Sequence, residues 1–188
     1  MQGRVVRTAR AAGMPPKGVH LLGRAHALAM EPRLRAEIDD HHPDFLHPGR
    51  SALILMIDTE EARPEVLAAV MLTETERPAF TLGRAQILEA LGVEAGARVA
   101  AITGDVPPPD AEDLAERLLL APDEVQRVAL AERLDHLRHA HLWPDVDERR
   151  RAHRQADEVY AGIAARVHPT LARRYARWCE MFGRSHLR

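Results

Sequence analysis

The sequence predicts an all-α domain, and three observations support that prediction. Ala, Leu, Glu and Arg dominate the composition, and these residues favour helices. Apolar residues make up 46% of the chain but aromatic residues only 4%, so the core must be mostly aliphatic. Apolar positions recur at helical spacing, and no convincing alternating strand pair is present. We expect one compact domain of about seven to nine helices over residues 19–188, joined by short connections.

Proline and glycine interrupt the helical pattern in the first quarter of the chain. Residues 1–18 are basic and contain several of both, which predicts an irregular segment. Residues 20–39 are helical in pattern, although Pro32 should start, bend or interrupt the helix. Residues 39–49 are rich in Pro, Asp and Gly and predict a loop. Pro48 then suits the first position of a buried helix that runs to about residue 58.

The remainder of the chain continues this helical pattern. Pro64 opens a strongly apolar helix, which we expect to end near Glu76 because Pro78 discourages continuation. Residues 94–103 have a composition that also suits a strand, but their length and setting favour a helix. Three consecutive prolines make residues 105–110 a rigid, extended loop. Further helices are expected over residues 82–91, 94–103, 111–120, 123–141, 145–165 and 169–182.

Composition excludes several classes of protein. A formal net charge of −2 argues against strong nonspecific nucleic-acid binding. The single cysteine, Cys179, excludes an intramolecular disulfide. No stretch approaches the roughly 18 apolar residues of a membrane span, and the basic N-terminus lacks an apolar signal region. We expect a cytoplasmic protein that does not enter membranes. Lys17 is the one lysine among 26 basic residues, so the surface is rich in guanidinium groups that suit carboxylates and phosphates.

The most informative stretch is the helix around residues 130–138, which has two distinct faces. Leu130, Leu134 and Leu137 have the spacing of a core-facing stripe. Two acids and two imidazoles form a second stripe that suits a metal or proton-transfer site, but an ordinary solvated face has the same pattern. The residues of this second stripe are Glu132, Asp135, His136 and His139.

Three other places carry residues suited to chemistry. His47 precedes Pro48 at an expected loop–helix junction, with His41 and His42 nearby, and is either a metal ligand or a loop histidine. Residues 73–76 place two glutamates at a helix C-terminus, where the dipole prefers cations, so they are either functional or a solvated last turn. Residues 149–151 are three arginines, which form either a solvated face or a phosphate site.

The order of these segments resembles the HD-domain hydrolases of the RelA/SpoT type, the guanosine tetraphosphate 3′-pyrophosphohydrolases. The likeness extends from about residue 25 to residue 182, with the helix around Glu132 as its most specific part. The segments that carry it are His47-Pro48 with Ala52-Leu53-Ile54-Leu55, residues 64–72, Leu130-Ala131-Glu132-Arg133-Leu134 with Leu137-Arg138, and Glu158-Val159-Tyr160-Ala161 with Ala164 and Arg166.

This resemblance implies a divalent metal, typically Mn²⁺, held by two histidines and two aspartates. Ligation by more carboxylates would suit Mn²⁺ or Mg²⁺. The departures fall on those ligands. His47 is retained, but the His-Asp pair becomes Thr73 and Glu74, and the last metal aspartate becomes Glu132. Each longer carboxylate side chain shifts its oxygen by about one bond, where metal sites tolerate a few tenths of an ångström. Asp135 and His136 stand where the family has His-Asn.

Three hypotheses follow from these departures. In the first, the metal site is degenerate and the protein binds a guanosine polyphosphate or another nucleotide as a regulatory module, with little or no hydrolysis. In the second, a rebuilt site hydrolyses such a nucleotide, with Glu74 and Glu76 as catalytic carboxylates. Its metal ligands are His47, Glu74 and Glu132, with Asp135 or His136 replacing the lost ligand. In the third, the protein is an interaction module without a ligand.

Overall fold

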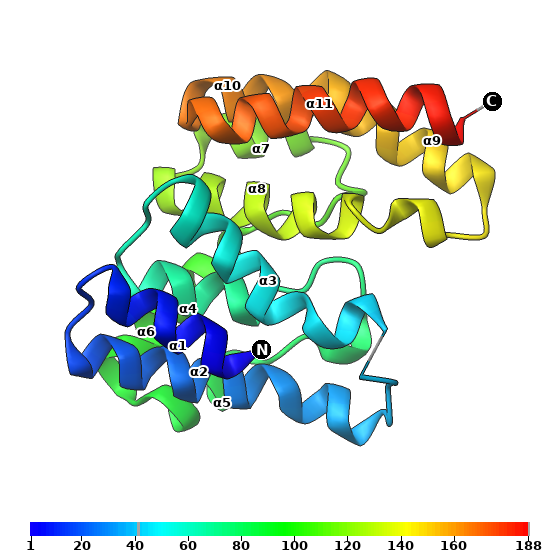
Figure 1. Ribbon diagram of the computed structural model, residues 1–188. Helices are drawn as coiled ribbons and strands as arrows, with labels where there is room; N and C mark the ends of the chain where they lie inside the picture. Colours follow the sequence, from blue (N-terminus) through cyan, green and yellow to red (C-terminus); the bar gives the residue numbers. More distant parts are fainter. Residues whose placement is uncertain (41, 188) are drawn as a thin grey trace.

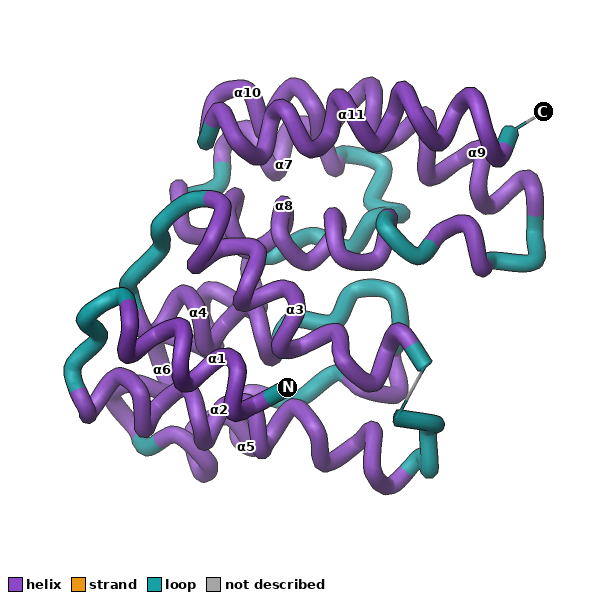
Figure 2. Tube along the Cα trace, in the orientation of Figure 1, coloured by secondary structure: helices purple, strands orange, loops and turns teal. Residues whose placement is uncertain are grey.

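The computed structural model describes residues 1–40 and 42–187, and within these ranges the regular structure is entirely helical (Figures 1 and 2). The predicted all-α fold is therefore confirmed. The helices of the described residues are more numerous than the seven to nine expected. They are α1 (Gln2–Ala11), α2 (Pro16–Arg35), α3 (Pro43–Asp58), α4 (Pro64–Leu72), η1 (Pro78–Phe80), α5 (Arg84–Leu91), α6 (Val93–Asp105), α7 (Leu114–Leu120), α8 (Asp123–Leu137), η2 (Ala140–Leu142), α9 (Val146–Gln155), the π-helical segment η3 (Ala156–Tyr160), α10 (Ala161–Val167) and α11 (Pro169–His186).

Helix α8 is the centre of the arrangement. It lies between the N-terminal helices, which form the lower half of Figure 1, and the C-terminal helices α7 and α9–α11 above it. It packs against α3 and α4 on one side and against α10 and α11 on the other. Leu130, Leu134 and Leu137 are buried in the core, as their spacing predicts. The whole of its second half is buried, so the polar stripe that begins at Glu132 is not a solvated face.

The N-terminal segment is a helix, and the prediction that residues 1–18 are irregular was wrong. Helix α1 buries Val5 and Ala9 and packs against α2 and α3. The glycines and prolines of the segment lie mainly at its end, where Gly13 adopts a φ of +79° and Pro16 begins α2. They therefore shape the turn between two helices.

Helix α3 begins at Pro43, five residues earlier than predicted. The His42 ring accepts a hydrogen bond from the backbone N–H of Asp44 at 3.2 Å and so caps the helix. Pro48, expected at the helix start, instead lies inside the helix. Pro48 has no N–H to offer the Asp44 carbonyl, and the Arg33 guanidinium donates to that oxygen at 2.8 Å instead. His47 therefore lies on a helix, whereas its predicted neighbour His41 is outside the described residues.

Helix α4 ends at Leu72, not near Glu76 as predicted. Thr73 is extended, and its hydroxyl donates to the Ala69 carbonyl at 2.9 Å. The chain then turns so that Glu74 enters the protein interior. Among the residues that the structure describes, no helix combines the length and the apolar character needed to cross a membrane.

Candidate metal centre

His47 is held in one orientation by a buried carboxylate. Its Nδ1 lies 2.9 Å from Oδ2 of Asp135 on α8, and both side chains are almost fully buried. Arg50, one turn further along α3, donates to both oxygens of Asp135, with its Nη2 2.8 Å from Oδ2. Burial opposes ionisation of Asp135, but the hydrogen bonds from His47 and Arg50 outweigh it and hold the pKa well below its usual range. An ionised carboxylate can only accept, so His47 Nδ1 donates to Asp135 and Nε2 is the ring nitrogen left for other partners.

Glu74 is fixed by a cation from α2. The Arg33 Nη2 donates to Glu74 Oε2 at 2.6 Å, and the pair is buried. The other oxygen, Oε1, accepts a backbone hydrogen bond from Arg77 at 3.1 Å. Burial raises the pKa of Glu74, but the cations around it, with His136 foremost, outweigh burial and lower that pKa overall. Glu74 is therefore a buried carboxylate that remains ionised.

Glu132 and His136 project from α8 one turn apart. Thr75 holds Glu132 Oε1 with its backbone N–H at 3.0 Å and its hydroxyl at 2.6 Å. His136 Nε2 lies 3.3 Å from Glu74 Oε1 and 3.4 Å from Glu132 Oε1, but neither contact has hydrogen-bond geometry. Burial lowers the pKa of His136, and attraction to the two carboxylates outweighs it, raising the pKa to about 9.

Two imidazoles and one carboxylate converge at this point. The His47 and His136 rings stack with centroids 4.1 Å apart and planes inclined by 25°. The Nε2 atoms of both rings are buried without a hydrogen-bond partner. One donor atom from each of His47, Glu74 and His136 can be chosen so that all three lie within 4.8 Å of one another. Two imidazole nitrogens of this kind beside a carboxylate have the donor chemistry of a divalent-metal site.

A cavity of about 330 Å³ reaches this cluster at His136. Asp135 and His136 form its inner wall. The Arg77 Nε donates to Asp44 Oδ2 at 2.9 Å, and this ion pair fixes one side of the opening. The cavity presents two guanidinium groups beside the His136 imidazole, each paired with an aspartate of the same lining, and their remaining N–H groups suit a phosphate-bearing ligand. The basic side chains of its lining are Arg50, Arg77, His42, His136 and His139.

The structure brings three of the predicted metal ligands together. His47, Glu74 and His136 form the cluster, and Glu132 lies beside it. Asp135, predicted as an alternative ligand, instead orients His47 from behind. The second imidazole of the cluster therefore comes from α8, where the sequence offered either Asp135 or His136.

Other predicted site residues lie outside the cluster. Glu76, predicted as a catalytic carboxylate, forms an ion pair with the buried Arg133 and is not part of the cluster of His47, Glu74 and His136. Thr73 binds the backbone of its own helix, and His139 lines the cavity. In the arginine run of residues 149–151, Arg150 pairs with an aspartate on the exposed face of α9.

Sequence reasoning missed Arg33 and Arg50. Arg50 lies three residues after His47 on α3, so helical spacing offered a signal for it. Arg33 had no such signal, since its contact with Glu74 joins residues 41 apart in the chain.

Comparisons with protein-family models, with curated proteins and with solved structures give no match for this chain.

Proposed function

We propose that this protein is a divalent-metal-dependent phosphohydrolase of HD type, with a metal centre rebuilt from His47, Glu74 and His136. The observation that carries the proposal is that two buried Nε2 atoms without a hydrogen-bond partner, those of His47 and His136, belong to one cluster with Glu74. The sequence resemblance implies a second metal histidine at the position that Thr73 occupies. His136 on α8 offers an imidazole to the same centre and so replaces the ligand that was lost there.

The residues present fit a divalent ion with mixed nitrogen and oxygen ligands. His47 and His136 offer one nitrogen each, and Glu74 offers Oε1, the oxygen that lies 3.3 Å from His136 Nε2. Glu132 Oε1 lies 3.4 Å from His136 Nε2 and is a fourth candidate donor. Imidazole together with carboxylate suits Mn²⁺, and Mg²⁺ is the alternative where oxygen ligands dominate. When bound, such an ion supplies Lewis acidity toward a phosphoryl oxygen and lowers the pKa of water.

The residues around the centre perform the other tasks of a phosphohydrolase. Asp135 holds His47 in the tautomer that presents Nε2 to the centre. Arg50 and Arg77 line the opening, and their N–H groups that are not engaged with Asp135 and Asp44 can bind and orient phosphate groups. The ligand class that we infer is a nucleotide with a pyrophosphate group, such as a guanosine polyphosphate. This substrate class rests on the sequence resemblance together with the two arginines of the cavity.

A second candidate is a nucleotide-binding regulatory module without turnover. Its supporting observation is that the charges of the centre are balanced by protein groups alone. Arg33 pairs with Glu74, and a protonated His136 lies between Glu74 and Glu132. A site neutralised in this way can persist without a metal ion.

Hydrolysis assays separate the two candidates. Guanosine tetraphosphate and a panel of nucleoside di- and triphosphates are incubated with the purified protein and added Mn²⁺. We expect release of phosphate or pyrophosphate that is lost in His47→Ala and retained in His20→Ala, a control at an exposed histidine on α2. Saturable nucleotide binding with no turnover would favour the regulatory module, and neither binding nor turnover would contradict both.

A further inference from the structure

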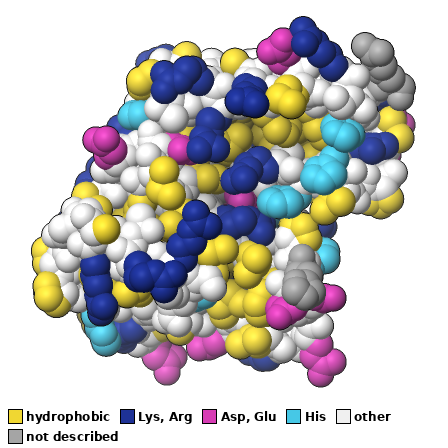
Figure 3. Space-filling view, in the orientation of Figure 1, with side chains coloured by type: hydrophobic (Ala, Val, Ile, Leu, Met, Phe, Trp, Pro, Cys, Tyr) yellow, Lys and Arg dark blue, Asp and Glu magenta, His cyan; other side chains and the backbone are white. Residues whose placement is uncertain are grey.

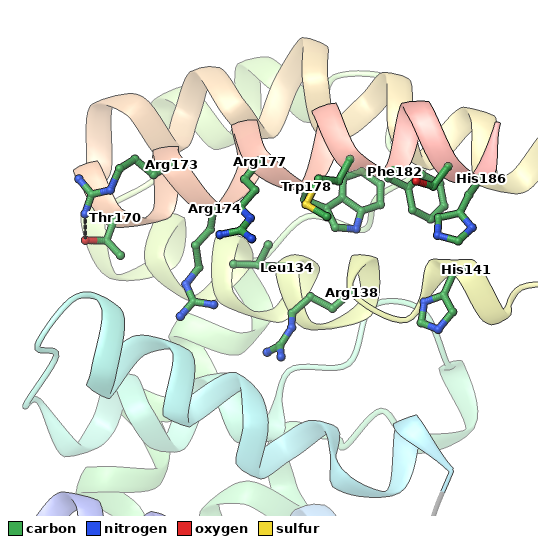
Figure 4. Close-up of a pocket in the computed structure, with 12 residues that line it drawn as sticks. Leu134, Arg138, His141, Thr170, Arg173, Arg174, Arg177, Trp178, Phe182 and His186 are labelled. Carbon is green, nitrogen blue, oxygen red and sulfur yellow. Dashed lines mark hydrogen bonds between the residues drawn. The ribbon is translucent and has the colours of Figure 1, made fainter. Parts of the chain in front are cut away.

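A second and larger cavity lies on the other side of α8 from the metal centre. It is a groove of about 720 Å³ between α11 and the C-terminal end of α8 with η2 (Figure 4). None of its lining residues also lines the cavity at the metal centre. Its volume lies within the range of small-molecule sites. The groove is therefore a separate candidate site with its own chemistry.

The lining of the groove is strongly cationic. Four arginines contribute to it, and no Asp or Glu does. Arg174 is already paired, since its Nε lies 2.6 Å from Asp58 Oδ2. Arg138 and Arg177 are exposed and form no ion pair with any residue in ranges 1–40 and 42–187. In the space-filling view, arginine and histidine side chains gather beside apolar surface on this face of the molecule (Figure 3). Guanidinium groups without a protein partner suit phosphate oxygens.

One wall of the same groove is aromatic. The half-buried Trp178 stacks on Phe182 with ring centroids 4.5 Å apart, and Phe182 lies 5.0 Å from His186. His141 faces His186 across the groove at 5.8 Å. Aromatic side chains of this kind provide a surface on which a nucleobase can stack, whatever its identity, because every base has a π-face.

We propose that this groove binds a free nucleotide, with its phosphates on Arg138 and Arg177 and its base against Trp178. Arginine and tryptophan side by side match the two halves of a nucleotide, whereas an inorganic anion would use only the arginines. The net charge of −2 opposes the long-range attraction that an extended nucleic acid needs, so we assign a free nucleotide in preference to a strand. This site does not depend on the metal centre.

Tryptophan fluorescence tests the assignment directly. The chain has two tryptophans, and Trp143→Phe leaves Trp178 as the one reporter. In this background, with EDTA present to remove divalent ions, we expect ADP or GDP to quench Trp178 fluorescence saturably. Arg138→Ala combined with Arg177→Ala should weaken binding by at least about tenfold, on the scale of lost charged hydrogen bonds. The control Arg184→Ala, at an exposed arginine of the same helix outside the groove, should change affinity less than about twofold.

Three results would overturn the assignment. The first is an absence of saturable quenching by either nucleotide in a protein whose circular dichroism shows a folded helical chain. The second is a change in the site of binding: either the Arg138/Arg177 double variant and the Arg184 control bind the nucleotide with equal affinity, or Arg77→Ala abolishes binding. Loss of binding in Arg77→Ala would place the ligand in the cavity at the metal centre. The third is inorganic triphosphate or oligothymidylate binding at least as tightly as the nucleotide, which would indicate a simple anion site or a nucleic-acid groove.

Discussion

His47 on α3 and Asp135 on α8 are joined by a buried contact of 2.9 Å between Nδ1 and Oδ2. The contact determines which His47 nitrogen faces the centre, because an ionised Asp135 accepts the Nδ1 proton. Arg50 supports the carboxylate from its other side. An orienting contact of this type behind a metal-binding histidine contributes to metal affinity without touching the ion.

Asp135→Asn should therefore weaken metal binding without abolishing it. The amide keeps the shape of the side chain but loses the charge that Arg50 and His47 share. We expect Mn²⁺ affinity to fall by about 10- to 100-fold, the usual effect of removing such a partner. Isothermal titration calorimetry measures this affinity, and Asp135→Asn with unchanged affinity would show that the contact is only structural.

The ion pair between Arg33 and Glu74 should be essential for stability. Replacing Arg33 with Leu leaves Glu74 buried and ionised without its partner. We expect the free energy of unfolding to fall by about 3–5 kcal/mol. Urea denaturation followed by circular dichroism measures the loss. The double variant Arg33→Leu/Glu74→Gln also removes the unpaired charge of Glu74 and should recover part of the lost stability. Equal losses of stability in the single and double variants would contradict this account.

Glu74 and Glu76 should differ sharply as metal ligands. Glu74→Gln removes a carboxylate from the cluster and should lower Mn²⁺ affinity at least about tenfold, because metal sites depend closely on ligand identity. Glu76→Gln should leave that affinity unchanged, since Glu76 pairs with Arg133. Both variants replace a glutamate with glutamine, so each is a matched control for the other. A larger effect of Glu76→Gln would restore the sequence-based prediction that it belongs to the site.

His26 should make the protein less stable in mild acid. Burial, together with nearby positive charge, lowers its pKa from 6.5 to about 4, and its Nε2 is buried without a partner. Between pH 4 and pH 6.5, His26 therefore binds more protons in the unfolded chain than in the folded chain. The contribution of neutral His26 to folding stability is complete above pH 6.5 and is lost as the pH falls. The loss is at most about 3 kcal/mol. Urea denaturation of wild type and His26→Leu at several pH values should show a steeper fall for wild type, and parallel curves would refute the prediction.

The helical class could be predicted from sequence because it depends on local spacing, but spacing alone did not decide whether the Glu132 stripe faces inward, since a solvated face has the same pattern. Glu132 and His136 lie one turn apart, which places them on one face of any helix. The end of α4 could not be predicted, because Glu74 turns inward toward Arg33 across 41 residues of chain. The start of α3 was mispredicted for a related reason. Pro48 is tolerated inside that helix since Arg33 satisfies the carbonyl that the proline leaves free.

Metal stoichiometry is the most direct test of the proposed centre. The protein is stripped with EDTA, dialysed against Mn²⁺ and analysed by inductively coupled plasma mass spectrometry. We predict about one ion per chain in wild type and in His139→Ala, which lines the cavity but lies outside the cluster, and a loss of that ion in His47→Ala and His136→Ala. Folded wild-type protein that retains no ion, or equal metal content in all four proteins, would contradict the account.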